Sequence, residues 1–221
     1  MFMMKIDFHV HSKYSSDCFM KIEKIVETAK MRGLDGVAVV DHNLVGDFKQ
    51  RFEDGFALIR GEEILTRAGE IIALNVDERI KPLMSVGDTV DKINNLGGTI
   101  ILPHPFCFWR KGSVFAYRKI KYPFVMEVMN GMAYFDFENN LSEYIAGKNN
   151  LPVSAGSDAH RYKDIGRAYT KLPDGSSIDD ILGKLVSGKG VPYGSRASKF
   201  VHMKVFANVF FKPAFNRWLE D

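Results

Sequence analysis

Five of the six histidines stand at the ends of short apolar segments that are typical of strands. His9 and His11 end KIDFHVH, His42 ends VAVVDH, His104 ends TIILPH and His160 ends SAGSDAH, whereas His202 lies apart from any such segment. Alternation along a strand points His9 and His11 to one face, which Asp7 shares, so that Asp7 is placed to orient an imidazole. One histidine in such a place is usually structural, but five together favour a site that binds metal ions.

Four carboxylates accompany these imidazoles. Asp17 follows the first predicted strand in the loop HSKYSSDC, and Asp158 shares a face with His160. Glu127 lies within the apolar segment FVMEVMN, where an unpaired charge is costly unless a cation neutralises it. These positions extend the predicted metal site from nitrogen to oxygen ligands.

The fourth carboxylate comes from the sequence GEE, which offers both Glu62 and Glu63. Glu63 continues the small or apolar alternate positions of FALIRG, a series suited to the interior of a barrel. Glu62 shares its side of the strand with Arg60 instead. We therefore favour Glu63 as the ligand.

The predicted metal site has nine ligands, all at converging strand ends. They are His9, His11, Asp17, His42, Glu63, His104, Glu127, Asp158 and His160. Nitrogen and oxygen ligands without thiolates suit Zn²⁺, Mn²⁺ or Fe ions, and nine ligands are enough for two or three ions if a carboxylate bridges. Three divalent ions would outweigh the four carboxylates in charge and leave a positive site, which favours three metals and a phosphate ester as substrate.

The elements that must position these residues alternate between apolar segments and amphipathic helices. Helices are predicted at residues 21–32, 87–97, 137–148 and 177–188, with Gly33 as the C-cap of the first. Such alternation predicts a parallel sheet, and this many units predict closure into a barrel with its site at the C-terminal ends of the strands. FALIRGEEI and AGEIIALNV predict an antiparallel hairpin within this pattern, and a count near seven strands fits the length.

The composition is that of an ordinary globular protein. The 221 residues are 46% hydrophobic and 26% charged, which excludes intrinsic disorder. A formal net charge of +3 gives no strong signal for nucleic-acid binding. Cys18 and Cys107 do not form a CxxC pair, and Lys5 and Asp7 precede any long apolar segment. We therefore expect a cytoplasmic protein with no signal peptide and no transmembrane segment.

Six blocks resemble, in order and spacing, the PHP family (polymerase and histidinol phosphatase). They are FHVHSKYSSDC, VVDH, GEEI, LPHP, MEVMN and GSDAH. The resemblance runs from about residue 4 to about residue 196 and is closest to small stand-alone members of that family. It implies a single α/β domain folded as a distorted TIM-like (β/α)7 barrel, with up to three metal ions held by the nine residues named above. It also implies that Glu63 is the bridging ligand.

The activity that this resemblance implies is hydrolysis of a phosphate ester by a hydroxide that bridges two metal ions. We assign the catalytic centre to Glu63, Asp158 and His160, and we expect a small phosphorylated substrate, with a nucleotide among the candidates. Arg110, Arg167 and Arg196 follow predicted strand ends and are candidate substrate contacts, because arginine binds phosphate with two hydrogen bonds. Each of them alone is more often a solvated surface charge.

Two other functions remain open at this point. An amidohydrolase-type enzyme also opens with HxH in a barrel, but it usually bridges two metals with a carboxylated lysine in mid-chain. A non-catalytic RNA-binding protein on a related barrel is the second alternative. Retention of every ligand position favours the phosphoesterase.

The barrel domain is expected to span residues 1–198 and to be followed by a tail, residues 199–221. Val201, Val205 and Val209 have helical spacing, and Pro213 interrupts the predicted helix. We expect this amphipathic helical tail to pack on the outside of the barrel. A homodimer contact or a helix on a membrane surface is the alternative, since phenylalanines and Trp218 lie beside basic residues.

Overall fold

One sheet forms the body of the protein in the computed structural model, which describes residues 3–107 and 116–197. Its strands follow the order β10-β9-β1-β2-β4-β5-β6-β7-β8, and β3 pairs with β4 off this path. The strands are β1 (Met3–Val10), β2 (Gly36–His42), β3 (Arg51–Glu53), β4 (Phe56–Thr66), β5 (Gly69–Leu74), β6 (Thr99–Leu102), β7 (Phe124–Asn130), β8 (Val153–Gly156), β9 (Ala168–Pro173) and β10 (Val191–Gly194). A parallel bridge between Val10 and Ala159 brings the segment after β8 back to β1. The sheet therefore forms a nearly closed barrel, the distorted TIM-like fold that the sequence predicts.

The barrel contains two groups of parallel strands, separated by antiparallel pairs. β1, β2 and β4 pair in parallel, as do β6, β7 and β8. The predicted hairpin is confirmed as β4 and β5, and β5 also pairs antiparallel with β6. The short strand β3 and the strands β9 and β10, both antiparallel additions on the β1 side, are absent from the sequence prediction.

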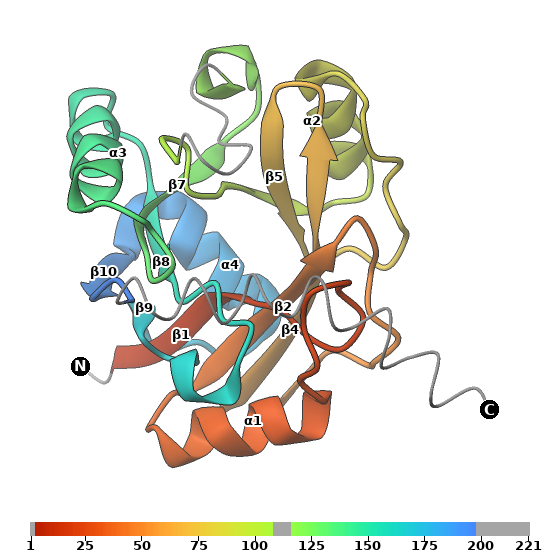
Figure 1. Ribbon diagram of the computed structural model, residues 1–221, viewed down its shortest axis with the longest axis vertical. Coiled ribbons are helices and arrows are strands. Elements are labelled where there is room, and N and C mark those ends of the chain that lie inside the picture. Colours follow the sequence, from red (N-terminus) through yellow and green to blue (C-terminus); the bar gives the residue numbers. More distant parts are fainter. Residues whose placement is uncertain (1–2, 108–115, 198–221) are drawn as a thin grey trace.

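The four predicted helices are confirmed. They are α1 (Ile22–Met31), α2 (Val86–Asn95), α3 (Asp136–Lys148) and α4 (Ile178–Lys184). Three shorter helical segments accompany them: η1 (Ala116–Lys119) before β7, η2 (Tyr162–Asp164) before β9 and η3 (Leu185–Lys189) directly after α4. Gly33 adopts a φ of +68° just after α1, the left-handed conformation that ends many helices. Figure 1 shows α1 alongside the β1–β2–β4 side of the barrel, with α2 next to β5 and α3 next to β7. No helix in the described part of the chain has both the length and the apolar character of a membrane span.

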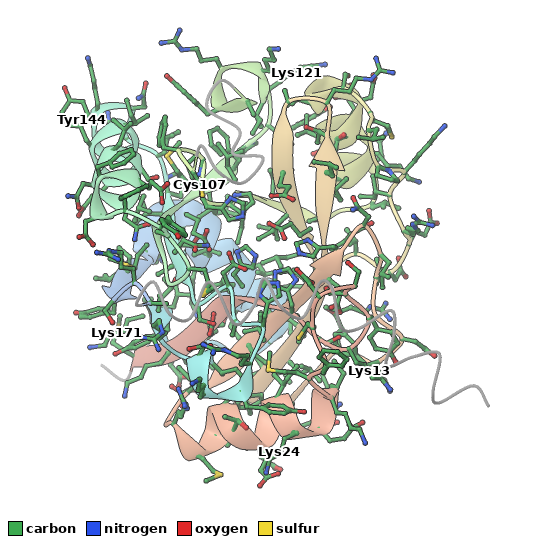
Figure 2. The ribbon with its side chains drawn as sticks, viewed as in Figure 1. Lys13, Lys24, Cys107, Lys121, Tyr144 and Lys171 are labelled. Carbon is green, nitrogen blue, oxygen red and sulfur yellow. The ribbon has the colours of Figure 1, made fainter. Side chains whose placement is uncertain are left out.

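Inward-facing side chains fill one end of the barrel with an apolar core. Each of the strands β1, β2, β4 and β5 contributes alternate residues, which include Phe8, Val40, Ile59 and Ile72. Ile178, Ile181, Leu182 and Leu185 belong to the same cluster, so α4 and the start of η3 cover that end of the barrel. The same inner face carries polar residues towards the C-terminal ends of β1, β2 and β7. Lys24, Lys121 and Lys171, in contrast, lie at the periphery of the molecule (Figure 2).

A bulge in β1 sets which residues face this interior. The register between β1 and β2 shifts between Asp7 and Val10, so Phe8 packs inside with Ile6 and His9 also turns inward. The expectation that Asp7 shares the face of His9 is therefore wrong. Asp7 instead accepts hydrogen bonds from the backbone N–H groups of Ser157 and Gly166, both at 2.8 Å, and ties β1 to the segment after β8. Burial raises the pKa of Asp7 to about 6.

Candidate metal centre

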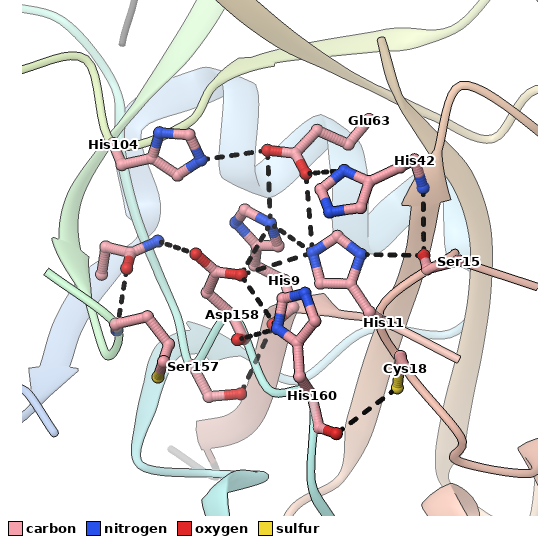
Figure 3. A network of polar contacts seen from close by, with 12 residues as sticks. His9, His11, Ser15, Cys18, His42, Glu63, His104, Ser157, Asp158 and His160 are labelled. Carbon is pink, nitrogen blue, oxygen red and sulfur yellow. Dashed lines mark hydrogen bonds and ion pairs between the residues drawn. The ribbon is translucent and has the colours of Figure 1, made fainter. Parts of the chain in front are cut away.

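Seven of the nine residues predicted as ligands meet at the C-terminal ends of the strands (Figure 3). Their nitrogen and oxygen atoms form groups of three, and within each group the atoms lie within 4.8 Å of one another. The groups are His9, Glu63 and His104; His9, His11 and Asp158; His11, His42 and His160; and His42, Glu63 and Glu70. Because His9, His11, His42 and Glu63 each belong to two groups, the structure holds one continuous cluster.

Local backbone structure brings these side chains together. His42 ends β2 and pairs in register with Glu63 on the neighbouring strand β4. His104 and Asp158 follow β6 and β8 and have φ angles of +27° and +54°. Such conformations are unfavourable for residues other than glycine, so the surrounding structure must hold both residues in place. Gly156 permits the close approach of β8, since a Cβ there would meet the Cβ of His9 and lie 2.8 Å from Glu127 Oε1.

Glu63 lies at the centre of the cluster and is fully enclosed by imidazoles. His104 Nε2 donates to its Oε1 at 3.0 Å, and Nδ1 of His42 lies 3.0 Å from its Oε2. Nε2 of His9 and Nε2 of His11 each lie 3.5 Å from a Glu63 oxygen. Burial alone would raise the pKa of Glu63, but the surrounding imidazoles hold it well below its usual range. A carboxylate reached from four sides in this way has the position expected of a bridging ligand.

The neighbouring Glu62 has the opposite environment. Its Oε2 accepts a hydrogen bond from the backbone N–H of Ile80 at 2.8 Å, on the outer face of β4. Burial raises the pKa of Glu62 to about 7. The structure thus places Glu63 and not Glu62 in the cluster.

The ring nitrogens of His9 and His11 face each other, with 3.1 Å between their Nε2 atoms. Nδ1 of His9 donates to Glu127 Oε1 at 3.1 Å, and Nδ1 of His160 donates to the carbonyl oxygen of Asp158 at 2.9 Å. These acceptors leave the Nε2 atoms of His9 and His160 as the ligand atoms. Asp158 Oδ1 completes the group at 3.7 Å from His9 Nε2 and 3.3 Å from His11 Nε2. Facing imidazole nitrogens beside a buried carboxylate are a donor set that fits a divalent cation.

The pKa shifts of these imidazoles differ in sign. Burial lowers the pKa of His9, but three nearby carboxylates outweigh this effect and hold that pKa well above its usual range. Burial, together with the neighbouring imidazoles of His160 and His42, lowers the pKa of His11 to about 3. Two facing ring nitrogens at 3.1 Å require one proton between them to form a hydrogen bond. A cation bound by both rings would replace that proton.

Asp17 and Glu127 lie beside the cluster and belong to none of its four groups. Asp17 Oδ2 is 3.2 Å from Nε2 of His160 and 3.4 Å from Nε2 of His42, and these imidazoles outweigh burial and lower the pKa of Asp17. Glu127 accepts hydrogen bonds from Nδ1 of His9 at 3.1 Å and from Nδ2 of Asn130 at 2.8 Å. Asn130 also donates to Asp158 Oδ2 at 3.2 Å and so joins two carboxylates of the site.

Glu70 is the residue of these groups that the sequence interpretation missed. It stands on β5 opposite Leu65 and two residues before Ile72, which faces the barrel interior. Its Oε2 lies 3.8 Å from Nε2 of His104. Alternation within the predicted hairpin, applied to its second strand as well as its first, would have indicated Glu70.

Two of the three arginines predicted as substrate contacts pair with aspartates, and the third lies outside the described residues. Arg167 donates from Nη2 to Asp164 Oδ1 at 3.1 Å. Arg196 pairs with Asp136, with 3.0 Å between Nη2 and Oδ2. Arg110 lies outside the described residues, as do the predicted domain boundary at residue 198 and the tail 199–221. These assignments stay predictions.

Comparison with known proteins agrees with this geometry. The PHP domain family matches residues 7–134, and the PHP-associated family matches residues 136–189. The uncharacterized protein MJ0417 of Methanocaldococcus jannaschii is 34% identical over 179 residues, which cover 77% of this chain and 71% of that protein.

Two solved structures share the fold. One is a two-domain protein of Bacteroides vulgatus that contains a predicted PHP-like metal-dependent phosphoesterase, with a TM-score of 0.69 and 21% identity over 96% of this chain and 70% of that one. The other is the lesion-specific endonuclease EndoQ of Pyrococcus furiosus, with a TM-score of 0.64 and 18% identity over 87% of this chain and 59% of that one. At these identities the likeness concerns the fold alone. The family match covers more than half of the chain, and the histidine and carboxylate groups lie at the strand ends. The chain therefore belongs to the PHP domain family.

Proposed function

We propose that this protein is a metal-dependent phosphoesterase that hydrolyses an ester of a small phosphorylated molecule, with nucleotides among the candidate substrates. The observation that carries the proposal is the set of adjoining ligand groups, three of which share His9 or His11. Shared ligands favour two or three neighbouring ions over a single structural one. Nitrogen and oxygen donors favour Zn²⁺, Mn²⁺ or Fe ions.

Each of the three imidazole-rich groups has the composition of a metal site. One would use His9, Glu63 and His104, a second His9, His11 and Asp158, and a third His11, His42 and His160, with Asp17 beside it. Divalent ions in such a site would supply Lewis-acid activation of a phosphoryl oxygen and of water. Asp17 and Glu127 remain proposed ligands, since both lie within hydrogen-bonding reach of imidazoles in these groups.

The chain's own residues orient and enclose the reacting groups. Glu63 and Asp158 are fully buried or nearly so, which keeps water from screening their charges. His160 holds its Nδ1 proton on the carbonyl oxygen of Asp158, so Nε2 is the atom that faces Asp17 and the cluster. Glu63, Asp158 and His160 are therefore our candidates for the catalytic centre.

A phosphate ester suits this site better than an amide. The residue that would bridge two ions is a glutamate, Glu63, whereas amidohydrolase-type sites usually depend on a lysine. The fold neighbours include a predicted phosphoesterase and an endonuclease, and both names refer to cleavage of phosphate esters. Five carboxylates lie in or beside the centre, so three divalent cations would give it a net positive charge that attracts an anion.

A comparison of adjacent residues tests the proposal. The metal-free protein would be loaded separately with Mn²⁺, Zn²⁺ and Fe²⁺ and screened against phosphomonoesters, phosphodiesters and nucleotides. We expect turnover by the wild type and by Glu62→Gln, the matched control on the outer face of β4, and none by Glu63→Gln. A metal-loaded wild type that turns over no ester of any class would contradict the proposal, as would a Glu63→Gln variant as active as the wild type.

A further inference from the structure

One buried hydroxyl connects a candidate metal ligand with a carboxylate outside the cluster. Nδ1 of His11 lies 3.2 Å from Oγ of Ser15, and the same Oγ lies 2.7 Å from Oδ1 of Asp41 (Figure 3 shows the His11 contact). His11, Ser15 and Asp41 are all fully buried. The metal-ligand groups contain neither Ser15 nor Asp41.

The direction of these hydrogen bonds follows from the acceptors. Asp41 Oδ1 accepts from the backbone N–H groups of Ser12 and Ser15, at 2.8 and 3.1 Å. As a carboxylate oxygen it can only accept, so the hydroxyl of Ser15 donates its proton to it at 2.7 Å. A hydroxyl has one proton to donate. Since that proton points to Asp41, Ser15 Oγ accepts from His11, and Nδ1 of His11 must carry the proton. Nε2 of His11 is then the atom with a free lone pair, and it is this atom that faces His9 and Asp158.

The same hydroxyl also holds a second strand. The backbone N–H of His42 donates to Oγ of Ser15 at 3.1 Å. Ser15 belongs to the loop after β1, while Asp41 and His42 end β2. One side chain thus fixes the ring of His11 and the main chain of His42, two members of the group His11, His42 and His160.

We propose that Ser15 and Asp41 are positioning residues for metal binding: through the Ser15 hydroxyl, Asp41 locks His11 in the Nδ1–H tautomer and holds His42 beside it. The inference rests on the metal centre that the proposed function requires, and not on any substrate. His9 and His160 also direct Nδ1–H to an acceptor, Glu127 and a backbone carbonyl respectively. His11 differs because its acceptor is a hydroxyl, whose orientation is set by the carboxylate of Asp41 behind it.

Ser12 provides a matched control. Its Oγ donates to the other oxygen of Asp41, Oδ2, at 2.7 Å, and Ser12 is as fully buried as Ser15. Ser12→Ala therefore removes a hydroxyl bond to the same carboxylate while the link from Asp41 to His11 stays in place. Ser15→Thr keeps the hydroxyl, whereas Ser15→Ala removes it.

Two measurements test the proposal without any substrate. In the first, nitrogen-15 NMR of the metal-free wild type at neutral pH reports which ring nitrogen of His11 carries the proton. We expect Nδ1–H; a His11 found in the Nε2–H form would overturn the proposal whether or not any variant folds.

In the second, the affinity for Zn²⁺ and for Mn²⁺ is measured by competition with a chelator. Outer partners of metal-binding histidines typically change affinity by about 10–100-fold. We expect a loss in that range for Ser15→Ala at one site, recovery in Ser15→Thr, and a change below about threefold in Ser12→Ala. Wild-type affinity in Ser15→Ala, or an equal loss in Ser12→Ala, would overturn the proposal. Because the readout is binding of the metal alone, a protein without phosphoesterase activity that still gave the expected result would count against the proposed function only.

Discussion

The two ends of the barrel interior are built by the same strands and have opposite chemistry. At one end Phe8, Val40 and Ile59 pack with the apolar side chains of α4. A few residues further along the same inner faces, His9, His42 and Glu63 replace them. Apart from His42, which is partly exposed, both sets are buried, and His9, Phe8 and Ile59 are almost completely inaccessible to solvent.

This contrast shows what each end contributes. Burial of the apolar end stabilises the fold, because it removes hydrocarbon from water without leaving polar atoms unsatisfied. Burial of the polar end is costly unless the charges are compensated. At the C-terminal ends of its strands the fold thus holds a cluster whose charges a cation would compensate. Substitutions at the two ends should therefore affect different properties.

The largest expected effect belongs to the polar end. His42→Ala removes a residue shared by two ligand groups, and we expect phosphoesterase turnover to fall by at least about 1000-fold, or roughly 4 kcal/mol in activation free energy. The fold should persist, since His42 ends a strand and is not part of the apolar clusters. Kinetics, elemental analysis and circular dichroism check this. Retained turnover at wild-type metal content would show that the cluster is not the catalytic centre.

The apolar end should respond in stability. Ile59 is fully buried in the core between β4 and α4, and Ile59→Ala should lower the free energy of unfolding by about 2–5 kcal/mol. Denaturant titration gives this value, and metal affinity measured below the transition should stay as in the wild type. A variant that lost metal while remaining folded would mean that the two ends are not separable.

Metal removal should have a smaller effect on stability. Binding at a free metal concentration 100-fold above Kd stabilises the native state by about 2.7 kcal/mol, which corresponds to roughly 5–11 °C for a domain of this size. We therefore expect a chelator to lower the Tm of the wild type and of Ile59→Ala by similar amounts, and that of Glu63→Gln far less. Equal shifts in all three proteins would place the stabilising metal elsewhere.

The smallest effect is expected outside both ends. Arg196 and Asp136 form an exposed ion pair near the start of α3, and exposed pairs contribute little. Arg196→Ala should change the free energy of unfolding by less than about 1 kcal/mol. If Arg196 also contacts substrate, KM rises while kcat stays constant. A loss of stability beyond that limit would show that this pair supports the barrel.

The sequence predicts the polar end well because ligand types and strand ends coincide within each segment. His9, His42 and Glu63 could be placed from alternation and from the end of each apolar segment. The same rule failed at Asp7, because the bulge in β1 depends on pairing with β2 and leaves no local signal. Ser15 and Asp41 meet across 26 residues of chain, and Arg196 meets Asp136 across 60, so these contacts exist only once the fold is formed.

Strand prediction failed where segments were short or half-exposed. β3 has three residues, and β10 is the four-residue segment VPYG, whose proline and glycine are unusual in strands. In β9 the alternate residues Ala168, Thr170 and Leu172 are buried and the residues between them are partly exposed. Its sequence nevertheless contains few strongly apolar residues. Its place beside β1 is decided by the antiparallel pairing of residues that lie more than 160 positions apart.

Anomalous X-ray scattering from crystals of the metal-loaded protein tests the central claim most directly, because it locates each ion and identifies the element. We expect two or three peaks, each bound by side chains of at least one of the groups that contain His9, His11, His42, Glu63, His104, Asp158 and His160. Crystals grown with Mn²⁺, Zn²⁺ or Fe²⁺ in excess that show no peak among these residues, or one peak held elsewhere, would contradict the account.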